Sequence, residues 1–298
     1  MSRPRVIVVA KKSNLSRFYS GEGDSRAAHL LQSGHETVKK WRPAHESHIR
    51  TVDRVVEGLE KAGVETILLH GAQAEFDPLG AALIVTVGGD GTLLAASHNV
   101  SDVPILGVNS APRYSVGFFC AARGAQALRT LRMALDQRVA SVSLNRMAVR
   151  INGHLRSQRV LNEALYCHAE PAATSTYILK AGGKKEEQRS SGFWVGTAAG
   201  STAAMRSAGG RILPLTSRKL QVVVREPYVA DGRRPTLLKM VVSERSRVVS
   251  LSKMDRVRVF LDGPYRMLRA RLGDEVTFEV SDQPLTVVGL NKDRTRAH

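Results

Sequence analysis

One stretch, residues 83–96, constrains the fold of this 298-residue chain more than any other. It opens with an uninterrupted run of aliphatic and β-branched residues, which is typical of a buried strand, and continues into Gly88-Gly89-Asp90-Gly91-Thr92. Glycine permits positive φ and lets a ligand approach the backbone closely. The stretch therefore predicts a buried strand, a glycine turn and a helix that starts near Thr92.

The composition of this turn suggests a chemical role. Backbone N–H groups beside a helix N-terminus bind phosphate well, which makes Gly88, Gly89, Gly91 and Thr92 candidate nucleotide-binding residues. The carboxylate of Asp90 would repel a bare phosphate, so it indicates work on a hydroxyl group or on a metal that accompanies the phosphate. The alternative is a purely structural turn in which Asp90 caps the helix.

Composition excludes several classes of protein. The hydrophobic share of 43% is enough for the core of one large domain or two smaller ones. No apolar run approaches the roughly 20 residues of a membrane span, and the first residues do not form a signal peptide, so we expect a cytoplasmic protein that does not bind membranes. Neither Cys120 nor Cys167 has the spacing of a metal site, and both are expected to be reduced.

The charge of the chain, +17, would suit an anionic partner. The basic residues are scattered, however, and aromatic residues make up only 5% of the chain, so stacking surfaces for nucleic acid bases are hard to build. We expect small-molecule partners and no nucleic acid, with a basic RNA-binding protein as the alternative that a salt-steep affinity for polynucleotide would reveal.

Hydrophobic periodicity predicts two domains. Strands at 6–10, 64–69, 83–87 and 103–109 alternate with helices at 44–62 and 124–135, which favours a parallel α/β domain over residues 1–138. From 139 to 298 the pattern has period two, with a hairpin turn at Asn152-Gly153. The strands expected there are 142–151, a strand ending near 168, 177–180, 220–224, 237–242, 248–251, 257–261, 276–280 and 285–288. This half predicts an antiparallel, β-rich, sandwich-like domain.

Two stretches of the β-rich half interrupt the alternation. Asn162 and Glu163 are adjacent polar residues inside an apolar segment, where neighbours point to opposite faces of a strand. A strand end or a bulge beside a ligand would accommodate both, whereas an exposed edge would need no ligand. Residues 191–210 run from a strand into a Gly-, Ser- and Thr-rich turn and a helix of small residues. Such a turn suits a flat ligand, although close helix packing also selects small residues.

Together these motifs resemble the NAD kinase family over roughly residues 6–290. The matching segments are Gly88-Gly89-Asp90-Gly91-Thr92, residues 104–109, Leu161-Asn162-Glu163, Gly200-Ser201-Thr202-Ala203 with residues 207–210, residues 261–263 and residues 272–274. The sequence is similar to that of the plant-type NADH kinase branch at residues 108–110, 197–205, 220–221 and 224–227.

The resemblance implies transfer of the ATP γ-phosphoryl group to the 2′-hydroxyl of the adenosine ribose of NAD or NADH. It implies Mg²⁺ or another divalent cation with ATP, and an active site between the two domains of a homodimer or homotetramer. Asp90 would be the catalytic base, and Gly91 would lie against the same substrate.

The resemblance also assigns binding roles in the β-rich half. Asn162 and Glu163 would hold the ribose or nicotinamide end of the dinucleotide. The adenine side would be bound by Thr202, Ala203 and Ser207.

This chain departs from the usual family pattern at several positions. Ser191 stands where most members have an Asp that contacts the substrate, which bears on the preference for oxidised or reduced cofactor. Ala198, Ala204 and Pro264 replace the usual Pro, Tyr and Gln. Two further hypotheses for the function stay open. One is a lipid kinase, which shares the Gly-Gly-Asp-Gly motif, and the other is a non-catalytic dinucleotide-binding sensor.

Overall fold

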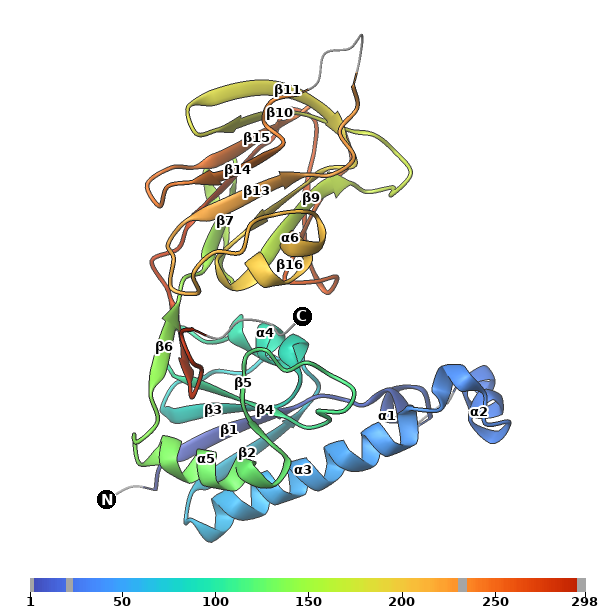
Figure 1. Cartoon of the computed structure of the whole chain (residues 1–298), viewed down its shortest axis with the longest axis vertical. Coiled ribbons are helices and arrows are strands. Elements are labelled where there is room, and N and C mark those ends of the chain that lie inside the picture. The colour runs from blue at the N-terminus through green and yellow to red at the C-terminus, as the bar shows by residue number, and fades with distance from the viewer. Residues whose placement is uncertain (1–2, 20–23, 230–234, 294–298) are drawn as a thin grey trace. The chain divides into compact units, whose positions relative to one another are not determined.

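The computed structural model describes residues 3–19, 24–229 and 235–293 (Figure 1). The chain divides into two compact units. The first contains Met1–Val142 and Thr286–Asn291, and the second contains Ser143–Leu285 and Lys292–His298. Each unit has a hydrophobic core of its own.

The first unit is built on a sheet with the strand order β2-β1-β3-β4-β19-β6, and β5 also pairs with β4. Its strands are β1 (Arg5–Ala10), β2 (Glu65–His70), β3 (Ala81–Gly88), β4 (Ile105–Asn109), β5 (Cys120–Arg123), β6 (Ser141–Leu144) and β19 (Leu285–Val288). The pairings of β1 with β2 and β3, and of β4 with β3, β5 and β19, are all parallel. Parallel strands place their carboxyl ends at one edge of a sheet, where α/β proteins bind ligands.

Helices cover both faces of this sheet (Figure 1). The covering helices are α3 (Trp41–Lys61), α4 (Asp90–Ser97) and α5 (Ala127–Leu135). The short helices α1 (Asn14–Tyr19) and α2 (Ser25–Gln32) lie beyond the sheet beside the end of α3, and there are two 3₁₀ turns, η1 (Glu36–Val38) and η2 (Gly124–Gln126). The apolar faces of α3 and α5 share one core with alternate residues of the strands. The other face of the sheet meets α4, whose Leu93 lies against Gly107 of β4.

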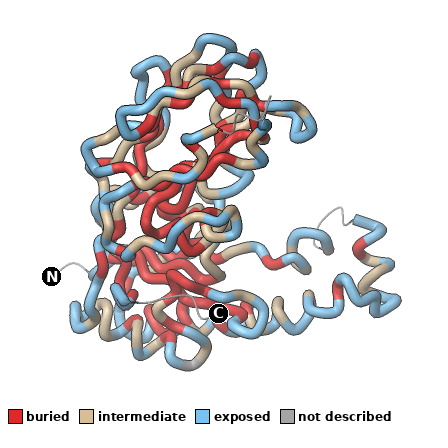
Figure 2. Tube along the Cα trace, turned by 45° about the horizontal axis from the view of Figure 1, so that its top comes forward, coloured by how far each residue is buried: buried red, intermediate tan, exposed pale blue. Residues whose placement is uncertain are grey.

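The second unit consists of two six-stranded sheets with the orders β11-β10-β15-β18-β7-β8 and β14-β13-β12-β9-β16-β17. The strands are β7 (Met147–Ile151), β8 (His154–Val160), β9 (Glu163–His168), β10 (Ser175–Ala181), β11 (Lys184–Ser190), β12 (Phe193–Gly196), β13 (Leu220–Val224), β14 (Lys239–Val242), β15 (Val248–Ser252), β16 (Val257–Leu261), β17 (Arg266–Ala270) and β18 (Glu275–Val280). Between β12 and β13 lie η3 (Ala199–Thr202) and α6 (Ala204–Ser207). Residues of both sheets pack into one core. Figure 2 shows that the buried residues lie mainly along the strands.

The expected fold class, a parallel α/β part followed by an antiparallel sandwich-like part, is confirmed. At the predicted hairpin turn, Asn152 and Gly153 have φ of 51° and 78°, as a two-residue turn of this type requires. Helix α3 ends at Lys61, and Gly63 follows with φ of 72°. In the residues that the structure describes, no helix is both long and apolar enough to cross a membrane.

Several boundaries differ from those that the sequence predicts. The single strand expected to end near 168 is two strands, β8 and β9, in different sheets, and the helices expected at 44–62 and 124–135 are α3 and, after η2, α5. Helix α4 begins at Asp90, not Thr92. The single strand expected over 142–151 is two strands, β6 and β7, which belong to different sheets. Between them, Arg146 is fully buried and its Nε donates to the carbonyl oxygen of Gln283 at 2.6 Å. The segment expected as a last strand of the β-rich half, β19, lies in the parallel sheet of the first unit.

A buried histidine links α3 to the end of β4. The Nδ1 atom of His48 lies 2.9 Å from Oγ of Ser110, and the residue is only 2% exposed. Burial, and secondarily the positive charge of Lys11, lower the pKa of His48 to about 4. The folded protein therefore holds a neutral imidazole at this position over a pH range in which an exposed histidine would take up a proton.

This lowered pKa predicts a pH-dependent stability. The unfolded chain protonates His48 near its ordinary pKa of 6.5, so the stabilising effect of the neutral ring is complete above that pH and is lost as the pH falls toward 4. The loss is at most about 3 kcal/mol of unfolding free energy. Urea unfolding between pH 7 and pH 4 should show a steeper loss for the wild type than for His48→Gln. The exposed control His29→Gln should follow the wild type, and parallel curves for all three proteins would contradict the prediction.

Candidate active site

The glycine turn of the first unit is held by close backbone contacts. Gly88 ends β3, and a Cβ atom at this position would lie 2.1 Å from Oγ1 of Thr92, which leaves no room for a side chain. The carbonyl oxygen of Gly88 accepts the N–H of Ser110 at 2.9 Å, and that of Gly89 accepts the N–H of Thr92 at 3.0 Å. Thr92 is buried, whereas Gly91 is exposed and reachable by a ligand.

Asp90 is the first residue of α4 and is half-buried. Its Oδ1 accepts the backbone N–H of Phe119 at 2.7 Å, so the carboxylate is oriented by a segment distant in sequence. The N-cap position of the helix belongs to Gly89, not to Asp90. Asp90 therefore does not cap its own helix, as the structural alternative expected. No sequence pattern predicts the contact with Phe119, because this contact depends on how the segment after β4 folds back.

The fold-back of that segment depends on Asn109, the last residue of β4. Its Nδ2 donates to the carbonyl oxygen of Ser115 at 3.0 Å, and its Oδ1 accepts from Oγ of Ser115 at 2.8 Å. Gly117 has φ of 61°, and a Cβ atom there would lie 2.4 Å from Nδ2 of Asn109. Asn109 and Gly117 thus shape the turn that carries Phe119 to Asp90.

A second group of predicted residues lies in the second unit, at the passage from β8 to β9. Asn162 and Glu163 are 4% and 9% exposed. Both are buried because the chain leaves one sheet after Val160 and enters the other at Glu163. A strand thus ends at this pair, which is one of the two arrangements that the sequence predicted for it. An exposed edge pair is therefore excluded.

The carboxylate of Asp262 fixes this passage. It accepts the backbone N–H groups of Leu161 at 2.8 Å, Asn162 at 2.7 Å and Glu163 at 3.3 Å, and the N–H of Asp262 donates to the carbonyl oxygen of Glu163 at 3.0 Å. Asp262 has φ of 51°, a conformation that a non-glycine residue adopts only with supporting contacts. The sequence motif contained Asp262, but its role comes only from the structure.

The small-residue turn packs directly on the same passage. The N–H of Thr197 donates to the carbonyl oxygen of Asn162 at 2.9 Å, and the Thr197 hydroxyl bonds to the carbonyl of Leu161. A Cβ atom on Gly200 would lie 2.2 Å from the carbonyl oxygen of Asn162, so only glycine fits there. The structure thus brings the Asn162-Glu163 and Gly200–Thr202 motifs together, which sequence spacing alone could not establish.

Two polar side-chain atoms of this group are buried without a hydrogen-bond partner among the described residues. Oδ1 of Asn162 and Oγ1 of Thr202 are shielded from solvent and have no hydrogen-bond partner among the residues that the structure describes. Such atoms cost free energy unless a ligand or water satisfies them. Ala203 is half-buried and Ser207 is exposed on α6, where a ligand can reach both. The arrangement is suited to binding a polar, flat molecule.

Comparisons with known proteins point to one family. A family model described as the ATP-NAD kinase N-terminal domain matches residues 25–139. A probable NADH kinase from Oryza sativa subsp. japonica is 36% identical over 229 residues, which cover 69% of this chain and 70% of that protein. An NADH kinase from Arabidopsis thaliana is 34% identical over 245 residues, covering 72% of this chain and 75% of the relative.

The fold is also found in a solved structure. The crystal structure of an NAD kinase from Archaeoglobus fulgidus in complex with ATP superposes with a TM-score of 0.68 and covers 97% of this chain and 94% of its own. Only 21% of the aligned residues are identical, so this likeness concerns the fold.

The triple acceptor role of Asp262 yields a prediction. In Asp262→Asn, one acceptor oxygen becomes an N–H₂ group that faces backbone N–H donors, so at least one buried donor loses its partner. The unfolding free energy should fall by about 1–3 kcal/mol. Hydrogen exchange should accelerate at the amides of residues 161–163. Asp255→Asn, the same change at an exposed position of the second unit, is the control, and unchanged exchange in Asp262→Asn would refute the role.

Proposed function

The chain belongs to the NAD kinase family, and on that premise we propose which of its residues bind the substrates and which takes part in catalysis. The protein is an ATP-dependent NAD(H) kinase: it transfers the γ-phosphoryl group of ATP to the 2′-hydroxyl of the adenosine ribose of NAD or NADH. A protein catalyses phosphoryl transfer mainly by positioning the two substrates and stabilising the charge of the transferred group. A lipid kinase is not favoured, since the relatives described above are named for dinucleotide substrates.

Asp90 is the proposed catalytic base. The observation that carries this assignment is its half-buried carboxylate at the start of α4, oriented by the N–H of Phe119 at 2.7 Å. A ribose hydroxyl is a weak nucleophile near neutral pH, and a positioned carboxylate that accepts its proton contributes about 10²–10⁴-fold to such reactions. Gly88, Gly89, Gly91 and Thr92 are proposed to bind nucleotide through the backbone of the same turn.

The residues of the second unit are proposed to bind the dinucleotide. Asn162 and Glu163 hold its ribose or nicotinamide end, and Thr202, Ala203 and Ser207 its adenine side. Support comes from the buried atoms Oδ1 of Asn162 and Oγ1 of Thr202, for which the described residues provide no hydrogen-bond partner. A polar ligand would satisfy both.

A divalent cation, Mg²⁺ or another, is proposed to enter with ATP. Among the described residues, no group of three or more His, Cys, Asp or Glu side chains could hold a metal ion. Mg²⁺ is usually bound by one or two carboxylates together with substrate phosphates. Asp90 is the carboxylate that the nucleotide-binding turn offers to such a cation, which when bound neutralises phosphate charge.

Two further properties are proposals on the same premise. We propose a homodimer or homotetramer, supported by the family and testable by light scattering. We also propose a cytoplasmic location: Cys120 and Cys167 do not form a disulfide bond with each other, as is usual for cysteines in a reducing compartment. Burial raises the pKa of the Cys167 thiol, which lowers its reactivity.

NADH is the proposed preferred acceptor. One plant relative is named an NADH kinase and the other a probable NADH kinase. Ser191 also carries no negative charge at the position where the resemblance implies an Asp in most family members. The purified protein with ATP and Mg²⁺ should form NADPH from NADH with a higher kcat/KM than NADP from NAD. Comparable values would contradict the preference. Absence of both products, with dinucleotide binding intact, would favour the sensor.

The assignment of Asp90 predicts the behaviour of a conservative variant. Asp90→Asn keeps an oxygen that can accept the N–H of Phe119 but cannot take a proton at neutral pH. Its kcat should fall by about 10²–10⁴-fold, while the dissociation constant for NADH changes little. Steady-state kinetics and calorimetry measure the two effects. Asp102→Asn, at an exposed position of the same unit, is the matched control, and wild-type turnover by Asp90→Asn would disprove the assignment.

A further inference from the structure

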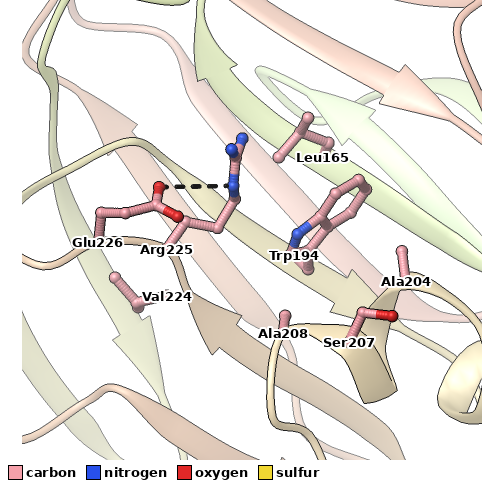
Figure 3. Close-up of a pocket in the computed structure, with 8 residues that line it drawn as sticks. All are labelled: Leu165, Trp194, Ala204, Ser207, Ala208, Val224, Arg225 and Glu226. Carbon is pink, nitrogen blue, oxygen red and sulfur yellow. Dashed lines mark ion pairs between the residues drawn. The ribbon is translucent and has the colours of Figure 1, made fainter.

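A cavity of about 750 Å³ opens within the second unit, beside the small-residue turn (Figure 3). It is lined by Leu165, Trp194, Ala204, Ser207, Ala208, Val224, Arg225 and Glu226. Its volume lies in the range of cavities that hold small molecules. Of the residues that the motifs assigned to substrate, only Ser207 reaches it, so most of the wall has no function assigned.

Trp194 provides the aromatic surface of this cavity. Its neighbours in β12, Phe193 and Val195, are fully buried in the core, whereas Trp194 is partly exposed. Because successive residues of a strand point to opposite faces, the indole of Trp194 is directed away from the core. In Figure 3 it stands between Arg225 and the helix that carries Ala204 and Ser207.

Arg225 is held beside the indole by several contacts. Its guanidinium carbon lies 6.0 Å from the centroid of the Trp194 ring. Its NH1 group donates to the carbonyl oxygen of Ser191 at 3.5 Å, and its backbone N–H donates to that of Gly192 at 2.8 Å. Its Nε lies 3.7 Å from Oε2 of Glu226, whose side chain is 66% exposed and therefore screens the positive charge only weakly.

The opposite wall leaves space for a flat ring. It consists of Ala204, Ser207 and Ala208, all with short side chains. The family's usual tyrosine is absent at Ala204, so Trp194 is the one aromatic residue among those that line the cavity. Aromatic rings and guanidinium groups both stack on heteroaromatic rings, and a stacked base is typically bound several-fold to a hundredfold more tightly.

We propose that Trp194 and Arg225 form a wall on which a flat, uncharged ring of the dinucleotide stacks. The inference rests on the NAD(H) kinase function. Adenine and dihydronicotinamide are both uncharged, whereas the oxidised nicotinamide ring carries a positive charge that Arg225 repels. The wall therefore binds either the adenine, which NAD and NADH share, or the dihydronicotinamide, which only NADH has.

The test compares three substitutions at tryptophan. Trp194→Leu removes the ring and should raise the KM for NADH by about 5- to 100-fold, with the KM for ATP unchanged. Trp194→Phe keeps a smaller ring and should restore most of the affinity. Trp41→Leu is the matched control, because Trp41 is the other tryptophan of the chain and stacks on Phe18 in the first unit. It should leave the KM for NADH at the wild-type value.

A substitution at Arg225 identifies which ring is bound. If the ring is dihydronicotinamide, Arg225→Met should lower the preference for NADH over NAD by several-fold, because the charge that repels the oxidised ring is gone. If the ring is adenine, Arg225→Met should raise the KM for NAD and NADH by the same factor. Either result supports the stacking wall. Melting temperatures near that of the wild type establish that the variants are folded.

The inference and the function on which it rests fail in different ways. If the wild type forms NADP(H), but folded Trp194→Leu and Arg225→Met keep wild-type KM values for both dinucleotides, the stacking wall is refuted and the kinase function stands. If the wild type forms no product, the kinase function itself is refuted. In that case unchanged binding of NADH to Trp194→Leu, measured by calorimetry, would refute the wall as well.

Discussion

The second unit depends on one carboxylate. Asp262 accepts three consecutive backbone N–H groups at the point where the chain leaves one sheet for the other. Leu161 and Asn162 lie between β8 and β9, outside any strand, so without these bonds their buried N–H groups would lose their partner. The same passage presents the carbonyl oxygens of Leu161 and Asn162 to Thr197. The substrate-binding turn is thus built on the strand passage that Asp262 holds.

Both candidate groups of residues use glycine in the same physical way. At Gly88 a Cβ atom would collide with Thr92, and at Gly200 one would collide with the backbone of Asn162. In each case the absent side chain lets two backbone segments approach closely, and the polar groups nearby are positioned by these contacts. A motif rich in glycine is therefore part of the packing of the fold as well as a surface for ligand.

Much of the architecture could be predicted from the sequence, but edge and returning strands could not. β11 consists of Lys184–Ser190, a charged segment without an apolar face, and it forms a strand because it pairs with β10 across the Gly182-Gly183 turn. Charged residues are common on edge strands, where they prevent aggregation. β19 resembles any short apolar strand, and only its pairing with β4 shows that the chain returns to the first sheet.

The sequence by itself determined the two-part fold, the glycine turn with its carboxylate and the family, because these depend on local periodicity and on contiguous motifs. Tertiary structure alone decided which distant groups meet: Phe119 with Asp90, Asp262 with residues 161–163, and Arg225 with Trp194. These contacts join residues far apart along the chain, or on neighbouring strands whose register no local pattern specifies. Their existence depends on the closing of loops and sheets, which a linear pattern does not encode residue by residue.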